Sequence, residues 1–206
     1  MRLEEARRDE FRKLARELGY RSRAAFKLLQ ADKKYRIFGK GQAVLDLGSA
    51  PGGWLQVASQ AVGKNGLVVG VDIKKFEDVS SNVIILQKDV FDVNLVPELL
   101  KISSAGYDVV LSDLAPNTSG IWELDHNRQV GMSERVLEIC SSVLKKRGSL
   151  FMKVFEGERF NYIFELAKSN FISVSITKPK ASRKESSEVY IYCRGYKLGL
   201  DTSLTA

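Results

Sequence analysis

The sequence predicts a doubly wound α/β domain, in which helices cover both faces of a mainly parallel sheet, and two observations support this. Short runs rich in Val, Ile and Leu alternate with segments of helical periodicity along most of the 206 residues. These runs are apolar at nearly every position, as expected of strands buried on both faces. We therefore expect a single domain, residues 1–206, with a helical N-terminal segment at 1–40 and an α/β core at 41–197.

Five runs in the middle of the chain have the length and composition of parallel strands. Most of them follow a Gly, Asn or Asp, which marks the preceding turn. Two more strand patterns near the end of the chain are separated only by the polar loop "PKASRKESS", which predicts an antiparallel hairpin at one edge of the sheet. The expected strands are 42–48, 67–73, 82–87, 107–114, 148–154, 171–178 and 188–196.

Helical patterns fill the segments between the strands. One follows a glycine-rich turn after the first strand, and a long one ends at Gly148. Two more precede the core. The expected helices are 3–17, 22–36, 54–62, 94–104, 127–146 and 157–169.

Composition excludes several classes of protein. An apolar content of 44% supports a packed core, and 9% aromatic residues argue against a disordered chain. No run approaches the roughly 18 apolar residues of a membrane helix, and the charged start "MRLEEARRDEFRKL" lacks the core of a signal peptide, so we expect a cytoplasmic protein. Cys140 and Cys193 are too few for a disulfide framework or a zinc cluster. We expect both to be buried as small hydrophobes, and we expect no metal site.

Positive charge is concentrated at the two ends of the chain. Residues 1–40 contain 13 Lys and Arg against 6 Asp and Glu, and residues 178–197 contain 6 against 2. Residues 41–177 contain 13 against 16, so the middle is slightly acidic. A solvated helix face would explain one basic segment alone. Two basic segments around a neutral core favour a nucleic acid that lies across one face.

The stretch "VLDLGSAPGGW" predicts a tight turn between the first strand and a helix. Gly48, Gly52 and Gly53 allow the backbone to approach a ligand at the start of the helix, with Pro51 between them. A dinucleotide-binding turn would read G-x-G-x-x-G and hold a pyrophosphate. This turn does not have that spacing.

Acidic residues follow three successive strands. Asp46, at the end of the first strand, would repel a pyrophosphate but could accept hydrogen bonds from an ammonium group. Asp72, at the end of the second strand and 19 residues after Gly53, has the place of a carboxylate that binds a ribose diol. Asp89, after the third strand, is placed to contact an adenine edge. The pocket therefore suits an adenosine with a cationic tail, which describes S-adenosylmethionine. Ordinary solvent-facing aspartates beside a tight turn would explain each residue singly.

Four charged residues stand in unusual places: Lys27 in the apolar stripe of the second helix, Asp113 after a strand, Lys153 within "LFMKVF" and Glu188 at the start of the last strand. Ligand sites of open α/β sheets form at the carboxyl ends of the strands, where Asp113 and Lys153 fall. A lysine in an apolar strand is costly to bury without a partner. Solvated surface charges remain an alternative for Lys27 and Glu188.

Six motifs together resemble the FtsJ/RrmJ family of RNA ribose 2′-O-methyltransferases, over about residues 20–197. They are "YRSRAAFKLLQ", "DLGSAPGGW", "GVDI", "SDLAPNTSG", "FMKVFEG" and "SSEVYIYCRGYK". The resemblance implies a Rossmann-like class I S-adenosylmethionine-dependent methyltransferase fold, whose seven-stranded, mostly parallel sheet has an antiparallel last strand. It also implies S-adenosyl-L-methionine as cofactor, and a catalytic tetrad of Lys27, Asp113, Lys153 and Glu188.

The resemblance assigns roles to individual residues. Lys153 becomes the proton acceptor for the ribose 2′-hydroxyl. An unperturbed lysine has a pKa of roughly 10.4, so keeping it neutral at pH 7 costs about 4–5 kcal/mol. Lys27 would lower the pKa of Lys153, whereas Asp113 and Glu188 would raise it. The implied cofactor contacts are Gly52, Trp54, Asp72, Asp89 and Asp113, and the turn residues Asp46, Gly48, Pro51 and Gly53 are expected beside them.

The basic segments then become the expected RNA-binding surface, with Arg21 and Arg23 near Lys27 in sequence and Lys180, Arg183 and Lys184 on the edge hairpin. The short chain resembles the ribosomal enzymes, which favours a uridine of large-subunit ribosomal RNA, within the large subunit, and a monomeric enzyme. A tRNA anticodon loop is the second choice of substrate. A nicotinamide dehydrogenase and a non-catalytic RNA-binding ribosome-assembly factor are the alternatives from other classes.

Overall fold

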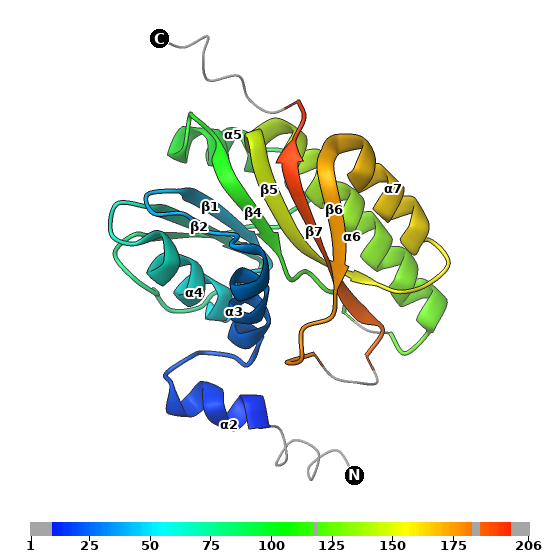
Figure 1. Ribbon diagram of the computed structural model, residues 1–206, viewed down its shortest axis with the longest axis horizontal. Helices are drawn as coiled ribbons and strands as arrows, with labels where there is room; N and C mark the ends of the chain where they lie inside the picture. The colour runs from blue at the N-terminus through cyan, green and yellow to red at the C-terminus, as the bar shows by residue number, and fades with distance from the viewer. Residues whose placement is uncertain (1–9, 118, 183–185, 199–206) are drawn as a thin grey trace.

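A seven-stranded sheet forms the centre of the protein (Figure 1). The computed structural model describes residues 10–117, 119–182 and 186–198. The strand order is β3-β2-β1-β4-β5-β7-β6, and all neighbouring strands are parallel except the pairs that β7 forms with β5 and with β6. The predicted fold class and edge hairpin are confirmed. The strands are β1 Ala43–Leu47, β2 Leu67–Asp72, β3 Val83–Gln87, β4 Tyr107–Ser112, β5 Leu144–Phe155, β6 Phe171–Thr177 and β7 Glu188–Tyr196.

Helices α3 and α4 cover one face of the sheet, and α5, α6 and α7 cover the other (Figure 1). Helix α2 lies beyond α3, outside the two layers. None of the described helices is long and apolar enough to cross a membrane. The helices are α2 Glu10–Glu17, α3 Ala24–Tyr35, α4 Gly53–Val62, α5 Leu95–Ile102, α6 Trp122–Val143 and α7 Phe160–Asn170.

The boundaries of α6 differ from the predicted 127–146. The helix begins at Trp122, because the Asp125 carboxylate accepts hydrogen bonds from the backbone N–H groups of Ser119 (2.8 and 3.0 Å) and Gly120 (3.3 Å) and so fixes the first turn. It ends at Val143, since Leu144 is fully buried and already pairs with Tyr107 of β4. The expected helix at 3–17 is observed from Glu10, and its first residues lie outside the described part of the chain.

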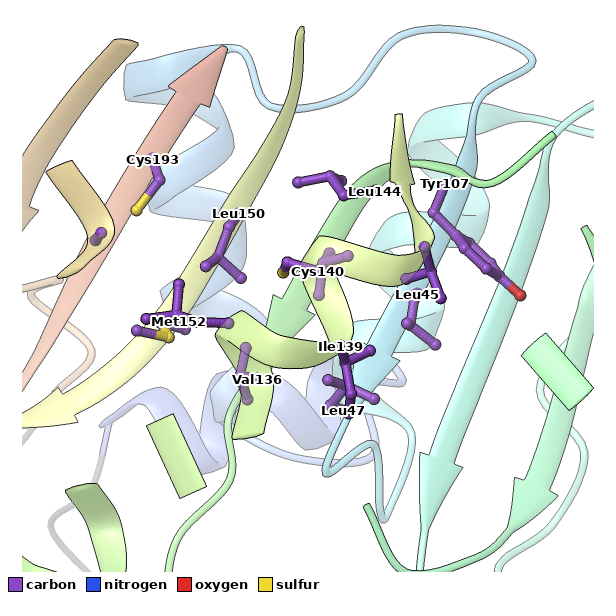
Figure 2. Close-up of a cluster of buried hydrophobic side chains, with 14 of the residues drawn as sticks. Leu45, Leu47, Tyr107, Val136, Ile139, Cys140, Leu144, Leu150, Met152 and Cys193 are labelled. Carbon is purple, nitrogen blue, oxygen red and sulfur yellow. The ribbon is translucent and has the colours of Figure 1, made fainter. Parts of the chain in front are cut away.

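The larger core cluster lies between the sheet and α5, α6 and α7. Cys140 of α6 and Cys193 of β7 are fully buried there, as predicted. Burial raises the pKa of both thiols, which keeps them protonated and unreactive. Figure 2 shows part of this cluster, in which side chains of α6 pack on those of β1 and β5: Val136, Ile139, Cys140, Leu45, Leu47, Leu150 and Met152.

The two basic segments of the chain meet in the structure. Phe26 of α3 and Ala181 of the β6–β7 loop belong to one small buried cluster, against which Phe11 of α2 packs. The backbone N–H of Ala181 also donates to Gln30 Oε1 at 3.3 Å. The described parts of α2, α3 and the β6–β7 loop therefore lie side by side and form one surface, which we call the basic platform (residues 10–34 and 178–182).

Candidate active site

The glycine turn between β1 and α4 is packed tightly against other parts of the chain. Gly48 has a φ of 82° and Gly52 one of 104°, conformations that residues with a side chain rarely adopt. A Cβ on Gly48 would lie 3.1 Å from the backbone nitrogen of Leu114, and one on Gly53 would collide with Ser22 Oγ. The glycines thus allow close packing of the turn against the segments that contain Leu114 and Ser22, at the carboxyl end of the sheet.

Asp46 is fully buried beside this turn, and neither of its carboxylate oxygens has a hydrogen-bond partner among the described residues. Burial raises its pKa well above the ordinary range, and the charges of Asp113 and Asp72 add to the effect. The Ser49 hydroxyl is also buried and unpartnered within the described chain. Buried polar groups are almost always satisfied, so these acceptors fit a ligand that brings donors, such as the ammonium group of S-adenosylmethionine.

Asp72 and Asp89 follow the neighbouring strands β2 and β3, as the sequence predicts. The Asp72 carboxylate accepts hydrogen bonds from the backbone N–H groups of Ala50 (2.9 Å) and Lys74 (2.8 Å), so it fixes the glycine turn. Asp89 is exposed and accepts a hydrogen bond from the N–H of Phe91 at 2.9 Å. Both carboxylates therefore lie on the same edge of the sheet as Asp46.

The indole of Trp54 is buried in the core rather than displayed as the wall of an open pocket. Its Nε1 donates to the carbonyl of Ala24 at 2.7 Å, and its ring centroid lies 5.6 Å from that of Phe151 and 6.0 Å from that of Tyr190. Trp54 thereby anchors the start of α4 to α3. Its place in the first turn of α4 also leaves its backbone N–H without an i−4 acceptor within the helix.

The four residues of the expected tetrad form two ion pairs at the carboxyl ends of β4 and β5. Lys153 Nζ lies 3.1 Å from Asp113 Oδ1 and donates to the Asp113 carbonyl at 2.6 Å. Lys27 Nζ donates to Glu188 Oε1 at 2.6 Å. The side chains of Lys153 and Lys27 are 6% and 8% exposed, so neither lysine is a solvated surface charge.

Tyr190, which the sequence analysis did not single out, connects the two pairs. Its hydroxyl donates to Asp113 Oδ1 at 2.8 Å and accepts from Lys27 Nζ at 3.0 Å, while its ring stacks on Phe151 at 4.9 Å. Burial raises its pKa well above the usual value, with a further contribution from the charges of Asp113 and Glu188, so the phenol remains a donor. In the sequence, the alternation of "EVYIY" indicates a strand that contains Tyr190. The place of Tyr190 in the site follows from the strand register, which pairs it with Lys153.

The residues expected to bind RNA have different environments. Lys180 is exposed on the β6–β7 loop, and Arg23 is half-buried directly before α3. The guanidinium of Arg21 instead donates to three backbone carbonyls of the protein. Arg183 and Lys184 lie outside the described residues.

Comparison with known proteins identifies the family of the chain. The model of the FtsJ-like methyltransferase family matches residues 20–196. The chain is 42% identical, over 95% of its length and 99% of the relative's, to the ribosomal RNA large subunit methyltransferase E of Nitrosopumilus maritimus. It is 44% identical to the protein of the same name from Methanocaldococcus jannaschii, over 92% of this chain and 79% of that one.

Among solved structures, a protein described as a ribosomal RNA methyltransferase from Plasmodium falciparum superposes with a TM-score of 0.77. The superposition covers 88% of this chain and all of that one, at 29% identity. The family model, the similar relatives and the shared fold therefore show that the chain belongs to the FtsJ-like methyltransferase family.

Proposed function

We propose that this protein methylates the 2′-hydroxyl of a ribose in large-subunit ribosomal RNA, most specifically of a uridine. The observation that carries the proposal is the network of Lys153, Asp113, Tyr190, Lys27 and Glu188 at the carboxyl edge of the sheet. Asp46 is buried without a hydrogen-bond partner in the described part of the chain, and it pairs in register with Leu111, two residues before Asp113, so the network adjoins the expected cofactor position.

Members of the FtsJ-like methyltransferase family depend on S-adenosylmethionine, which is therefore the cofactor of this chain. When bound, it supplies an electrophilic methyl group on a sulfonium. Asp46 would accept the ammonium of its tail, Asp72 the ribose diol and Asp89 the adenine edge. Gly48, Pro51, Gly52, Gly53 and Trp54 would shape the turn at which the tail lies.

Lys153 is the group that would hold the substrate hydroxyl. An ammonium has three N–H donors, and two of those on Lys153 are directed at the carbonyl and carboxylate of Asp113, which leaves one for the ribose 2′-oxygen. Alignment of this oxygen supplies much of the rate, since the positioning of two bound reactants lowers a barrier by up to several kcal/mol. In its neutral form Lys153 would receive the hydroxyl proton as the oxygen bonds to carbon.

The second ion pair keeps the charge of the site balanced. Lys27 is compensated by Glu188 at 2.6 Å, and Glu188 is held in turn by the Ser182 hydroxyl at 2.9 Å. The Tyr190 hydroxyl accepts a hydrogen bond from Lys27 and donates one to Asp113. It thereby helps to orient the Asp113 carboxylate toward Lys153. Lys27 and Glu188 would thus orient the pair that contacts the ribose.

Ribosomal RNA as substrate rests on the names of the relatives together with the basic platform, to which exposed Lys180 and the described basic residues of α2 and α3 contribute. The family assignment favours this function over a nicotinamide dehydrogenase and over a non-catalytic assembly factor. A tRNA anticodon loop is the alternative substrate. We further infer that the enzyme acts as a monomer in the cytoplasm on RNA within the large subunit.

The test is transfer of a radiolabelled methyl group from S-adenosylmethionine to isolated large subunits, naked large-subunit RNA and tRNA in parallel. Label in RNA of the large subunit, at a site that resists alkaline hydrolysis, is the expected result, since a 2′-O-methyl group blocks cleavage of the adjacent phosphodiester. Label in tRNA alone would replace the substrate assignment. Binding of the cofactor without label in any RNA would contradict the enzymatic function.

A further inference from the structure

The side chain of Arg21 joins two loops that are far from it in the sequence. Its Nη1 donates to the carbonyl of Pro51 in the glycine turn at 3.2 Å and to that of Glu77 at 2.6 Å. Its Nη2 donates to the carbonyl of Asp78 at 2.5 Å. Glu77 and Asp78 belong to the loop that follows β2 and Asp72. One guanidinium thus holds together the two loops that border the expected cofactor position.

The contact is close and is supported on both sides of Arg21. A Cβ on Gly52 would lie 3.0 Å from Arg21 Nη1, so the guanidinium fills the space that the glycine leaves open. The backbone N–H of Arg21 donates to Gln56 Oε1 at 2.9 Å, and the amide of Gln56 donates to the carbonyl of Gly19 at 2.9 Å. The segment that carries Arg21 is therefore fastened to the first turns of α4.

The hydrogen-bonding geometry of arginine suits this contact with three backbone carbonyls. Its planar guanidinium presents five N–H donors in a fixed fork, whereas a lysine offers a single point charge. Three of these five donors are directed at backbone carbonyls, so most of the hydrogen-bonding capacity of Arg21 is used within the protein. At the adjacent residue of the same turn, Asp72 accepts the N–H of Ala50 at 2.9 Å. Asp72 and Arg21 thus both hold the glycine turn by its backbone.

We propose that Arg21 is a positioning residue for cofactor binding and not a phosphate contact of the RNA-binding surface. This inference rests on the proposed function for the location of the cofactor site. The fork of Arg21 keeps Gly52 and the loop after β2 at a fixed separation, and this separation keeps the Asp72 carboxylate at the mouth of the site. Loss of the fork lets the two loops move apart before any ligand binds.

The experiment compares Arg21→Lys, Arg21→Gln and Arg36→Gln with the wild-type protein. Arg36 is a matched control, because it is an exposed arginine of the same segment whose side chain forms no described contact with the glycine turn. S-adenosylhomocysteine binding is measured by calorimetry in the absence of RNA. We expect both Arg21 variants to bind about tenfold more weakly, the equivalent of about 1.4 kcal/mol, and Arg36→Gln to bind as wild type.

RNA binding distinguishes the two roles of Arg21. Arg21→Lys keeps the charge and loses the fork, so its affinity for ribosomal RNA and the salt dependence of that affinity should match wild type. The proposal is overturned if Arg21→Lys binds S-adenosylhomocysteine as wild type does. It is also overturned if Arg21→Gln changes only the salt dependence of RNA binding. If Arg21→Gln shows no cooperative unfolding transition and is therefore misfolded, the comparison of Arg21→Lys with wild type decides the test.

Failure of this inference is distinct from failure of the proposed function. If the wild-type protein binds S-adenosylhomocysteine and the Arg21 variants bind it equally well, only the role of Arg21 is wrong. If the wild-type protein does not bind it, the cofactor site itself is wrong.

Discussion

The site has two halves, a cofactor half (Asp46, Asp72, Asp89 and the glycine turn) and a tetrad half (Lys27, Asp113, Lys153, Glu188 and Tyr190). They differ in how their buried polar groups are satisfied. In the cofactor half, Asp46 is completely buried and its oxygens find no partner among the described residues. In the tetrad half, Asp113 and Glu188 are each bound to a lysine and to a hydroxyl. The buried carboxylate of the cofactor half thus lacks hydrogen-bond donors within the described chain, whereas the carboxylates of the tetrad half are paired without a ligand.

This difference suggests that one half of the site determines cofactor affinity and the other determines the rate of methyl transfer. An unpartnered buried carboxylate destabilises the cofactor-free protein, and a ligand that supplies donors recovers that free energy as affinity. The paired charges of the tetrad are instead fixed in position, as expected of groups that must align a reacting hydroxyl. Substitutions in the two halves should therefore affect different measurements.

The largest effect should come from Lys153→Met, which keeps the length of the side chain and removes its nitrogen. We expect the rate of methyl transfer to fall by about 10²- to 10⁴-fold, because the group that holds and deprotonates the hydroxyl is lost. Single-turnover transfer of a radiolabelled methyl group measures the rate. Binding of S-adenosylhomocysteine should remain near wild type, and a near-wild-type rate would show that Lys153 is not the proton acceptor.

Asp46→Asn should change stability and affinity in opposite directions. Because the pKa of Asp46 is raised in the folded protein, its charge disfavours folding once the pH exceeds the ordinary aspartate pKa of about 3.9. At pH 7 the variant should be more stable by about 1–3 kcal/mol, the scale of an unpartnered buried group. The difference should shrink as the pH falls toward 4.

Urea unfolding of the cofactor-free proteins at pH 7 and pH 5 measures this difference, and calorimetry measures the expected loss of cofactor affinity. A variant that is both less stable and fully able to bind S-adenosylhomocysteine would mean that Asp46 is satisfied inside the protein.

A smaller effect is expected for Tyr190→Phe, which keeps the stacking on Phe151 and removes the hydroxyl between Asp113 and Lys27. Loss of these hydrogen bonds should lower kcat by about tenfold, the equivalent of about 1.4 kcal/mol, and leave KM for the cofactor unchanged. Steady-state kinetics separate the two constants. An increase in KM for the cofactor alone would place Tyr190 in the cofactor half.

The smallest effect is expected on the basic platform. RNA affinity should fall steeply with salt, and Lys180→Gln should lower the magnitude of the salt slope by about one. Lys101→Gln, an exposed lysine on α5 at the opposite end of the molecule from α2, is the control and should not change the slope (Figure 1). Filter binding across a salt series measures both. Equal slopes for Lys180→Gln and wild type would exclude a phosphate contact at Lys180.

The sequence predicts the cofactor half more fully than the tetrad half for a physical reason. Asp46, Asp72 and Asp89 follow successive strands, so their common location follows from the rule that parallel strands end at one edge. Tyr190 depends on its register opposite Lys153, and Arg21 on three carbonyls at least 30 residues away. Periodicity does not encode such contacts. The tetrad itself was found through the family resemblance and its unusual lysines.

The ion pair between Lys27 and Glu188 joins residues that are 161 positions apart in the chain. Glu188 opens β7, the last of the described strands in chain order, which lies between β5 and β6 in the sheet. Domains made on the ribosome fold as their elements emerge, and Glu188 and Tyr190 are synthesised after all the other described helices and strands. A nascent chain that has just completed its glycine turn therefore still lacks three of its four tetrad residues, and the ion pair of Lys27 forms only after β7 has been added.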